Sequence, residues 1–254
     1  MSEEKKSNDR SAGSRAGLDE TLGRYDSLMA ACRFDEAHDV LEQLLSTARS
    51  AGDRSLELTA LSELMGHCRQ TGRRDEGIGV CLEGIALLQD LSLDRAVSGG
   101  TVMINAATCL HSFGENGIAK QLFHAAERAY FENLPADRPE YAALYNNMAS
   151  VYETEGDLAS AAGYYKKALV SCESELDRAV THINIAQVYH RSGSTQARDE
   201  SISAAMGIFN DPSVVWDTYY AHTCRKCAGA LEAMGHAAQG KELTERADII
   251  SAGS

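Results

Sequence analysis

The sequence predicts an all-α protein, built as an α-solenoid of about six stacked helix hairpins. Two features of composition favour helices: the 254 residues include only three prolines, and the alternating β-branched or aromatic runs of strands are scarce. The third observation is an internal repeat, because similar turns recur at glycines that are 42, 42, 37 and 42 residues apart. These glycines are Gly72, Gly114, Gly156, Gly193 and Gly235.

Each repeat is expected to be a pair of helices joined at its glycine. An apolar-periodic segment of helical length lies on either side of each turn, and glycine supplies the left-handed backbone that ends a helix. An earlier turn, "ACRFDEA", places Cys32 at the equivalent position. In chain order, the hairpins are expected at about residues 18–50, 55–92, 97–134, 139–175, 177–210 and 215–251. Residues 1–17 are polar and rich in small residues, which predicts a disordered tail before a single superhelical domain, 18–254.

The residues within the hairpins resemble the tetratricopeptide repeat. In the fourth hairpin, large, large, small and aromatic residues precede the turn, and small, aromatic and small residues follow it. These residues are Tyr145, Met148, Ala149, Tyr152, Ala161, Tyr165 and Ala168. The third hairpin follows the same pattern, whereas the first matches mainly through "RFDEAHDVLEQLL". The second and sixth place Gly77 and Gly240 in the small position, and the fifth has Arg198 there.

The repeat length near 42 is similar to that of kinesin light chains and related bacterial proteins. The resemblance covers about residues 18–250. It implies a right-handed superhelix whose concave groove is lined by the first helix of each hairpin. It also implies a non-catalytic protein-protein interaction module that binds an extended peptide segment of another protein.

One inward position of the first helices carries asparagine in three consecutive repeats, at Asn105, Asn147 and Asn184. A side-chain amide both donates and accepts hydrogen bonds, so it can hold the C=O and N–H of a peptide unit together. Kinesin-light-chain-type repeats are similar in carrying asparagine on this face. Alternatively, these amides bond to the adjacent repeat and fix the superhelical pitch. No role is assigned to Asn146. The candidate peptide-binding residues are Asn105, Asn147, Asn184, Thr101, Thr108, Ser150, Gln187, Arg191, His222 and Lys226.

Three basic residues, Arg191, His222 and Lys226, are expected to gather at the C-terminal end of the groove. An acidic side chain or a carboxylate of the ligand could dock there through charge-assisted hydrogen bonds. The alternative function is a self-assembling scaffold that uses the outer face or an uncapped terminal repeat. The final segment, "AAQGKELTERADIISAG", shows no obvious polar capping helix after it, and the sequence therefore allows a homo-oligomer.

No catalytic residue, metal ligand or cofactor is predicted. Cys224 and Cys227 form a CxxC near His222, but no second CxxC completes a zinc site, and both cysteines fall on the buried side of a helix. The chain has no phosphate-binding glycine loop, HExxH or GxSxG. His38 is interpreted as a surface residue, and His67 shares no evident spacing with carboxylates. The protein is therefore predicted not to be an enzyme.

The charge and cysteine content limit the partner and the compartment. A net charge of −13 argues against nucleic acid and against an anionic membrane surface as partners. No apolar run approaches the roughly 18 residues that cross a bilayer, and the N-terminus lacks the apolar core of a signal peptide. Seven cysteines without framework-like spacing are typical of a reducing compartment. The sequence thus predicts a cytoplasmic protein.

Overall fold

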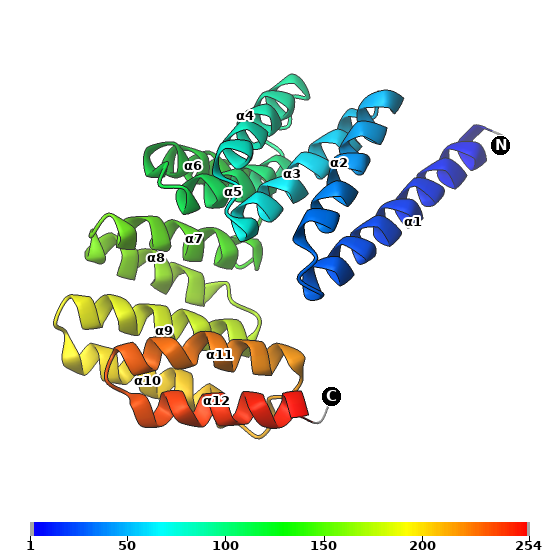
Figure 1. Ribbon diagram of the computed structural model, residues 1–254. Coiled ribbons are helices and arrows are strands. Elements are labelled where there is room, and N and C mark those ends of the chain that lie inside the picture. The colour runs from blue at the N-terminus through cyan, green and yellow to red at the C-terminus, as the bar shows by residue number, and fades with distance from the viewer. Residues whose placement is uncertain (1–2, 253–254) are drawn as a thin grey trace. The chain divides into compact units, whose positions relative to one another are not determined.

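The computed structural model describes the backbone of residues 3–252 and the side chains of residues 17–252. Over that range the chain forms twelve helices that pair into six hairpins, which confirms the predicted all-α solenoid class (Figure 1). The helices are α1 Glu3–Ala30, α2 Phe34–Ala51, α3 Arg54–Thr71, α4 Arg74–Asp90, α5 Val97–Ser112, α6 Asn116–Asn133, α7 Glu140–Thr154, α8 Leu158–Val170, α9 Glu175–Arg191, α10 Thr195–Phe209, α11 Thr218–Ala233 and α12 Ala237–Ala252.

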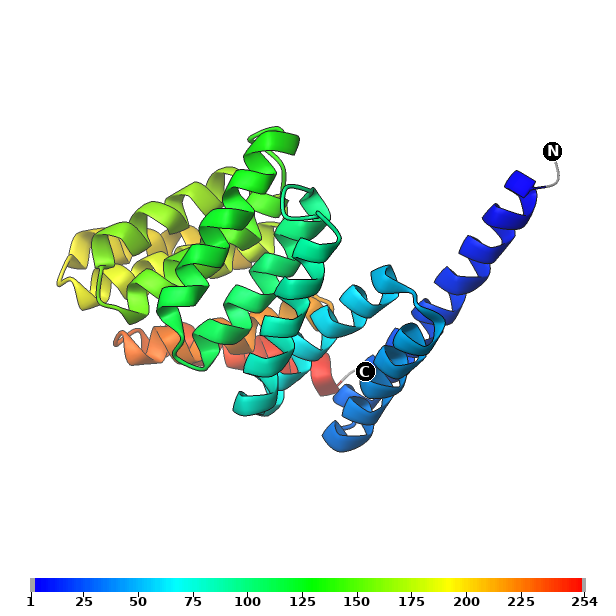
Figure 2. The ribbon, with the colours of Figure 1, turned by 90° about the horizontal axis from the view of Figure 1, so that it is seen from above.

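The chain divides into two compact units, Met1–Ala129 and Tyr130–Ser254. The first unit contains α1 to α5 and most of α6, and the second contains α7 to α12. In the second unit, the two helices of each hairpin run side by side in both views (Figures 1 and 2). A single continuous domain over residues 18–254 stays a prediction.

The first helix begins at Glu3, within the segment for which a disordered tail is predicted. The side chains of residues 1–16 lie outside the described residues. Disorder of the polar tail over residues 1–17 is therefore not tested and stays a prediction.

The turns within the hairpins depend on left-handed backbone. The five glycines of the repeat all have positive φ, from 73° at Gly72 to 87° at Gly114 and Gly235. In the first hairpin Cys32 adopts the same conformation with φ 56°, where a Cβ atom costs roughly 1–2 kcal/mol. The glycine spacing in the sequence therefore marks the real ends of the first helices.

The core of the first unit consists of leucine and methionine side chains from α2, α3 and α4. Leu41, Leu61, Leu64 and Met65 are completely excluded from solvent. Residues of this kind recur three or four apart along a helix, so that they form one apolar stripe that packs against the neighbouring helices. Stacking of the hairpins buries this stripe.

The core of the second unit includes the residues of the repeat pattern. Ala149 and Ala161 have no exposed surface, and Tyr165 is almost buried. The CxxC cysteines, Cys224 and Cys227, are also buried, as predicted, and pack among apolar side chains of α9 to α12. They act there as small apolar residues.

Among the described helices, none is both apolar enough and long enough to cross a membrane.

Candidate functional site

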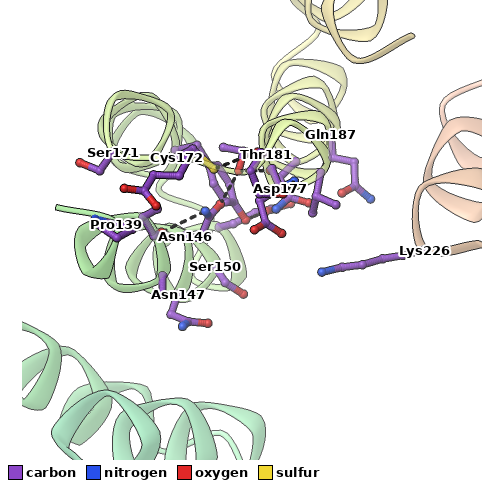
Figure 3. Close-up of a pocket in the computed structure, with 18 residues that line it drawn as sticks. Pro139, Asn146, Asn147, Ser150, Ser171, Cys172, Asp177, Thr181, Gln187 and Lys226 are labelled. Carbon is purple, nitrogen blue, oxygen red and sulfur yellow. Dashed lines mark hydrogen bonds between the residues drawn. The ribbon is translucent and has the colours of Figure 1, made fainter. Parts of the chain in front are cut away.

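A pocket of about 680 Å³ lies in the second unit, lined by α7, α9 and the loop between α8 and α9 (Figure 3). Lys226 reaches its edge from α11. The lining is mainly polar, with side-chain amides, hydroxyls and carboxylates. Five of the predicted peptide-binding residues line this pocket, namely Asn147, Ser150, Asn184, Gln187 and Lys226.

Helical periodicity explains why four of these residues share the pocket. Asn147 and Ser150 are three residues apart on α7, and Asn184 and Gln187 are three residues apart on α9. Residues at this spacing lie on the same face of a helix. The adjoining Met148 is buried and turns toward the core, so that the polar residues are left on the pocket side.

The amides of Asn147, Asn184 and Gln187 are half-buried. Within the described part of the chain, none of the three has a hydrogen-bond partner. Each amide has two N–H donors and one carbonyl acceptor. The pocket therefore presents unused donors and acceptors from two consecutive repeats.

The neighbouring Asn146 is engaged in a structural contact instead. Its Nδ2 donates to the carbonyl oxygen of Ala142 at 3.0 Å, and its Oδ1 accepts from the Oγ1 of Thr181 at 3.2 Å. Thr181 is on α9 and is 1% exposed. Its hydroxyl proton is shared with the Asp177 carbonyl at 2.8 Å, and the branch to Asn146 ties two successive first helices together. No role was expected for Asn146. Its partner Thr181 gives no sequence signal beyond being a hydroxyl residue in the expected fifth hairpin.

The two adjacent asparagines are expected to differ in their effect on stability. Replacing Asn146 with alanine should lower the free energy of unfolding by about 1 kcal/mol relative to Asn147→Ala, because only the first change removes a hydrogen bond between helices. Both changes remove the same poor helix former, so the difference in helix propensity cancels. Urea unfolding followed by circular dichroism measures both values. Equal stabilities would contradict the role assigned to Asn146.

Glu153 connects the pocket to its surroundings. Its carboxylate accepts hydrogen bonds from the Tyr165 hydroxyl and from the Arg191 guanidinium, both at 3.1 Å. Burial, together with the negative charge of Glu153, raises the pKa of Tyr165, which keeps this hydroxyl protonated. Arg191 also donates to the backbone carbonyl of Glu153 at 3.0 Å, so its charge is already paired.

The predicted basic trio is thus not assembled in the pocket. Arg191 is paired with Glu153, and neither Arg191 nor His222 lines the pocket. Lys226 lines it, and no ion pair of Lys226 occurs within residues 17–252. Glu173 and Asp177 also contribute carboxylates to the lining, and the Tyr219 hydroxyl donates to Asp177, which raises the pKa of Tyr219 to about 12. The charges of the site are mixed rather than basic.

The other predicted residues, Thr101, Asn105 and Thr108, belong to the first unit. Asn105 donates to the Oγ of Ser62 at 2.8 Å, which is the bond to an adjacent repeat that was the alternative for this position. The Thr108 hydroxyl donates to the Ile104 carbonyl of its own helix. The three equivalent asparagines therefore differ: one contacts the adjacent repeat, and two present free amides to a pocket.

Residues 143–179, which extend from α7 into α9, match the tetratricopeptide repeat. No curated protein matches the chain significantly.

Several solved structures have a similar fold. BtubC (BKLC) from P. vanneervenii is 19% identical, with a TM-score of 0.68, over 76% of this chain and 80% of that one. A Podosopora anserina putative kinesin light chain with nearly identical TPR-like repeats is 18% identical, with a TM-score of 0.59, over 77% of this chain and 95% of that one. The apo form of the quorum sensor NprR from B. thuringiensis is 14% identical, with a TM-score of 0.59, over 96% of this chain and 70% of that one.

At these identities the likeness concerns the fold. The predicted resemblance is confirmed: the chain has the fold of tetratricopeptide-repeat proteins, among them kinesin-light-chain-like ones, and carries the repeat itself at residues 143–179.

Proposed function

We propose that this chain is a non-catalytic protein-protein interaction module that binds an extended peptide segment of a partner protein in the pocket between α7 and α9. The observation that carries the proposal is the set of three unpartnered amides, Asn147, Asn184 and Gln187, in one pocket. Stacked helical repeats generally use their extended surfaces for binding. The interaction class is thus supported by the fold, and the location is supported by the site.

Main-chain recognition explains why amides are suited to this pocket. An extended peptide has one N–H and one C=O per residue, and it must lose water to enter the pocket. An asparagine or glutamine amide replaces both lost hydrogen bonds without demanding a particular side chain. Asn147 and Asn184 come from successive first helices, so that together they can hold two separate peptide units of one segment.

The experiment begins with selection of a phage-display library of random linear peptides on the immobilised wild-type chain. An enriched peptide is then synthesised, and its dissociation constant is measured by fluorescence anisotropy. The Asn147→Ala/Asn184→Ala double variant is expected to bind about tenfold or more weakly, since each lost hydrogen bond contributes roughly 0.5–1.5 kcal/mol. Asn105→Ala is the matched control, because this asparagine contacts Ser62 rather than the pocket.

Circular dichroism and thermal unfolding must first show that the variants are folded. Unchanged affinity in the double variant, or an equal loss in Asn105→Ala, would exclude the pocket as the binding site. Failure to enrich any peptide over a bare support would count against the proposal as a whole.

Self-assembly through the last repeat is the competing function. Its structural support is Ile249 on α12, which is 65% exposed. Light scattering at increasing protein concentration separates the two functions, because only self-assembly makes the apparent mass rise without a ligand.

A cytoplasmic location is part of the proposal, and the seven free cysteines support it.

A further inference from the structure

A second polar cluster lies in the first unit, and the proposed peptide binding does not involve it. His38 and Glu42 are four residues apart on α2, so they share a face of that helix, and Glu76 on α4 comes next to them. One ligand atom from each of these side chains lies within 4.8 Å of the other two. Two ligands of one zinc ion are at most about 4 Å apart, because each bond is about 2.0–2.2 Å long. The cluster is therefore within small side-chain rotations of a metal-binding geometry.

His67 on α3 lies beside this cluster, although its ring nitrogens are not among the three ligand atoms that lie within 4.8 Å of one another. Its side chain has no exposed surface, and neither Nδ1 nor Nε2 finds a hydrogen-bond partner among the described residues. The centroid of its ring is 5.3 Å from that of His38. An unpaired buried polar group costs about 1–3 kcal/mol, and an ion is one of the recognised reasons for such a group in a native protein.

The charges around the cluster suit a divalent cation. Glu76 turns Oε1 toward the Nε2 of His38, while its Oε2 accepts from the Arg73 guanidinium at 3.3 Å. Arg73 also pairs with Asp35 at 2.6 Å, so its positive charge is shared between two carboxylates. This contact orients Glu76, as partners of metal-binding carboxylates commonly do.

We propose that His38, Glu42 and Glu76 form a binding site for a divalent transition-metal ion of the zinc type, beside the buried and unpaired imidazole of His67. An imidazole together with two carboxylates suits zinc, whereas calcium and magnesium prefer oxygen ligands alone. The two carboxylates also neutralise the charge of the ion. In this arrangement the metal replaces the hydrogen bond between His38 and Glu76. It joins α2 of the first hairpin to α4 of the second, and so stabilises the stacking of these two repeats.

The test uses the full chain, freed of metal by a chelator, with Zn²⁺ alone as the probe. Cys32 is the exposed cysteine among the seven, so Cys32→Ser serves as the background in all samples. Isothermal titration calorimetry is expected to show one Zn²⁺ per chain. Thermal unfolding is expected to shift upward with Zn²⁺ and to stay unchanged with Mg²⁺.

Glu42→Gln and Asp39→Asn form a matched pair of variants. Both residues are exposed and on α2, and each change removes one negative charge, but only Glu42 belongs to the cluster. Glu42→Gln is expected to weaken zinc binding by about 100-fold or more, because loss of a direct ligand exceeds the 10–100-fold effect of losing an outer partner. Asp39→Asn should keep the affinity of the background within about twofold.

Three results would overturn the proposal: no binding of Zn²⁺, equal affinities in the two variants, or thiolate charge-transfer absorption with Co²⁺. The last would place the metal on cysteine instead. Because Glu42 is exposed and has no hydrogen-bond partner in the described range, its replacement leaves the fold intact, and the comparison with Asp39→Asn remains valid.

Discussion

Replacing Arg246 with alanine is expected to lower the free energy of unfolding by about 3 kcal/mol. The guanidinium of this α12 residue donates to the carbonyl of Phe209 at 2.7 Å, to the hydroxyl of Tyr220 at 3.0 Å and to the Oδ1 of Asn210 at 2.5 Å. It also lies 5.4 Å from the ring centroid of Trp216. The Arg246 side chain is only 15% exposed. Its removal leaves the Phe209 carbonyl with the Tyr220 hydroxyl as its remaining side-chain donor and takes the guanidinium donor from Asn210. Urea unfolding followed by circular dichroism measures the loss.

Lys241→Ala is the control for this prediction. Lys241 is on the same helix, but its side chain is 77% exposed and forms an ion pair with Glu245 at 3.5 Å. Such surface pairs contribute about 0–1 kcal/mol. If Arg246→Ala destabilises the chain no more than Lys241→Ala, the network around Arg246 does not hold α12 against the α10–α11 connection.

Gly99→Ala is expected to lower the free energy of unfolding by at least about 3 kcal/mol. A Cβ atom at this position would lie 1.9 Å from the carbonyl oxygen of Leu93. Overpacking by side chains costs about 1–3 kcal/mol and occasionally more. Here the obstacle is a backbone atom, which cannot rotate away, so the loop before α5 must shift. The thermal midpoint and the urea midpoint should both fall.

Gly79→Ala is expected to change the stability in the opposite direction. Gly79 is within α4, and nothing lies within 4 Å of a Cβ built there. Alanine is a better helix former than glycine by about 0.5–1 kcal/mol, so this variant should be more stable than the wild type. If Gly79→Ala and Gly99→Ala lowered the stability by similar amounts, the close approach of the Leu93 carbonyl to Gly99 would not explain the effect of Gly99→Ala.

The sequence predicted the repeating hairpins because their signals are local. A glycine with positive φ and an apolar stripe act within a few residues of themselves, so the turns at Gly72, Gly114 and Gly156 could be located without knowing any partner. Ser92 was not expected to adopt a positive φ of 55°. Serine gives no sequence signal for that conformation, which is set there by the connection between α4 and α5.

The candidate site was predicted only in part, because hydrogen bonds between repeats depend on side chains that are far apart in the sequence. Asn105 and Asn147 occupy equivalent positions, yet only Asn105 finds a hydroxyl, from Ser62, within reach. Arg191, which was expected in the groove, pairs with Glu153, which is 38 residues earlier, and nothing in the sequence signals that pair. A separation of an ångström or two decides such pairings, and periodicity specifies the face of a helix rather than the distance between two atoms.

The contrast between Asn146 and Asn147 has a kinetic consequence. Since Asn147, Asn184 and Gln187 have no hydrogen-bond partner among the described residues, a peptide that binds as proposed would break no internal hydrogen bond of these amides. The bond from Thr181 to Asn146 keeps α7 and α9 in place meanwhile. Association should therefore proceed in one step at an ordinary rate of about 10⁵–10⁷ M⁻¹s⁻¹. Different peptide sequences should then be distinguished by how long they stay bound rather than by how fast they arrive.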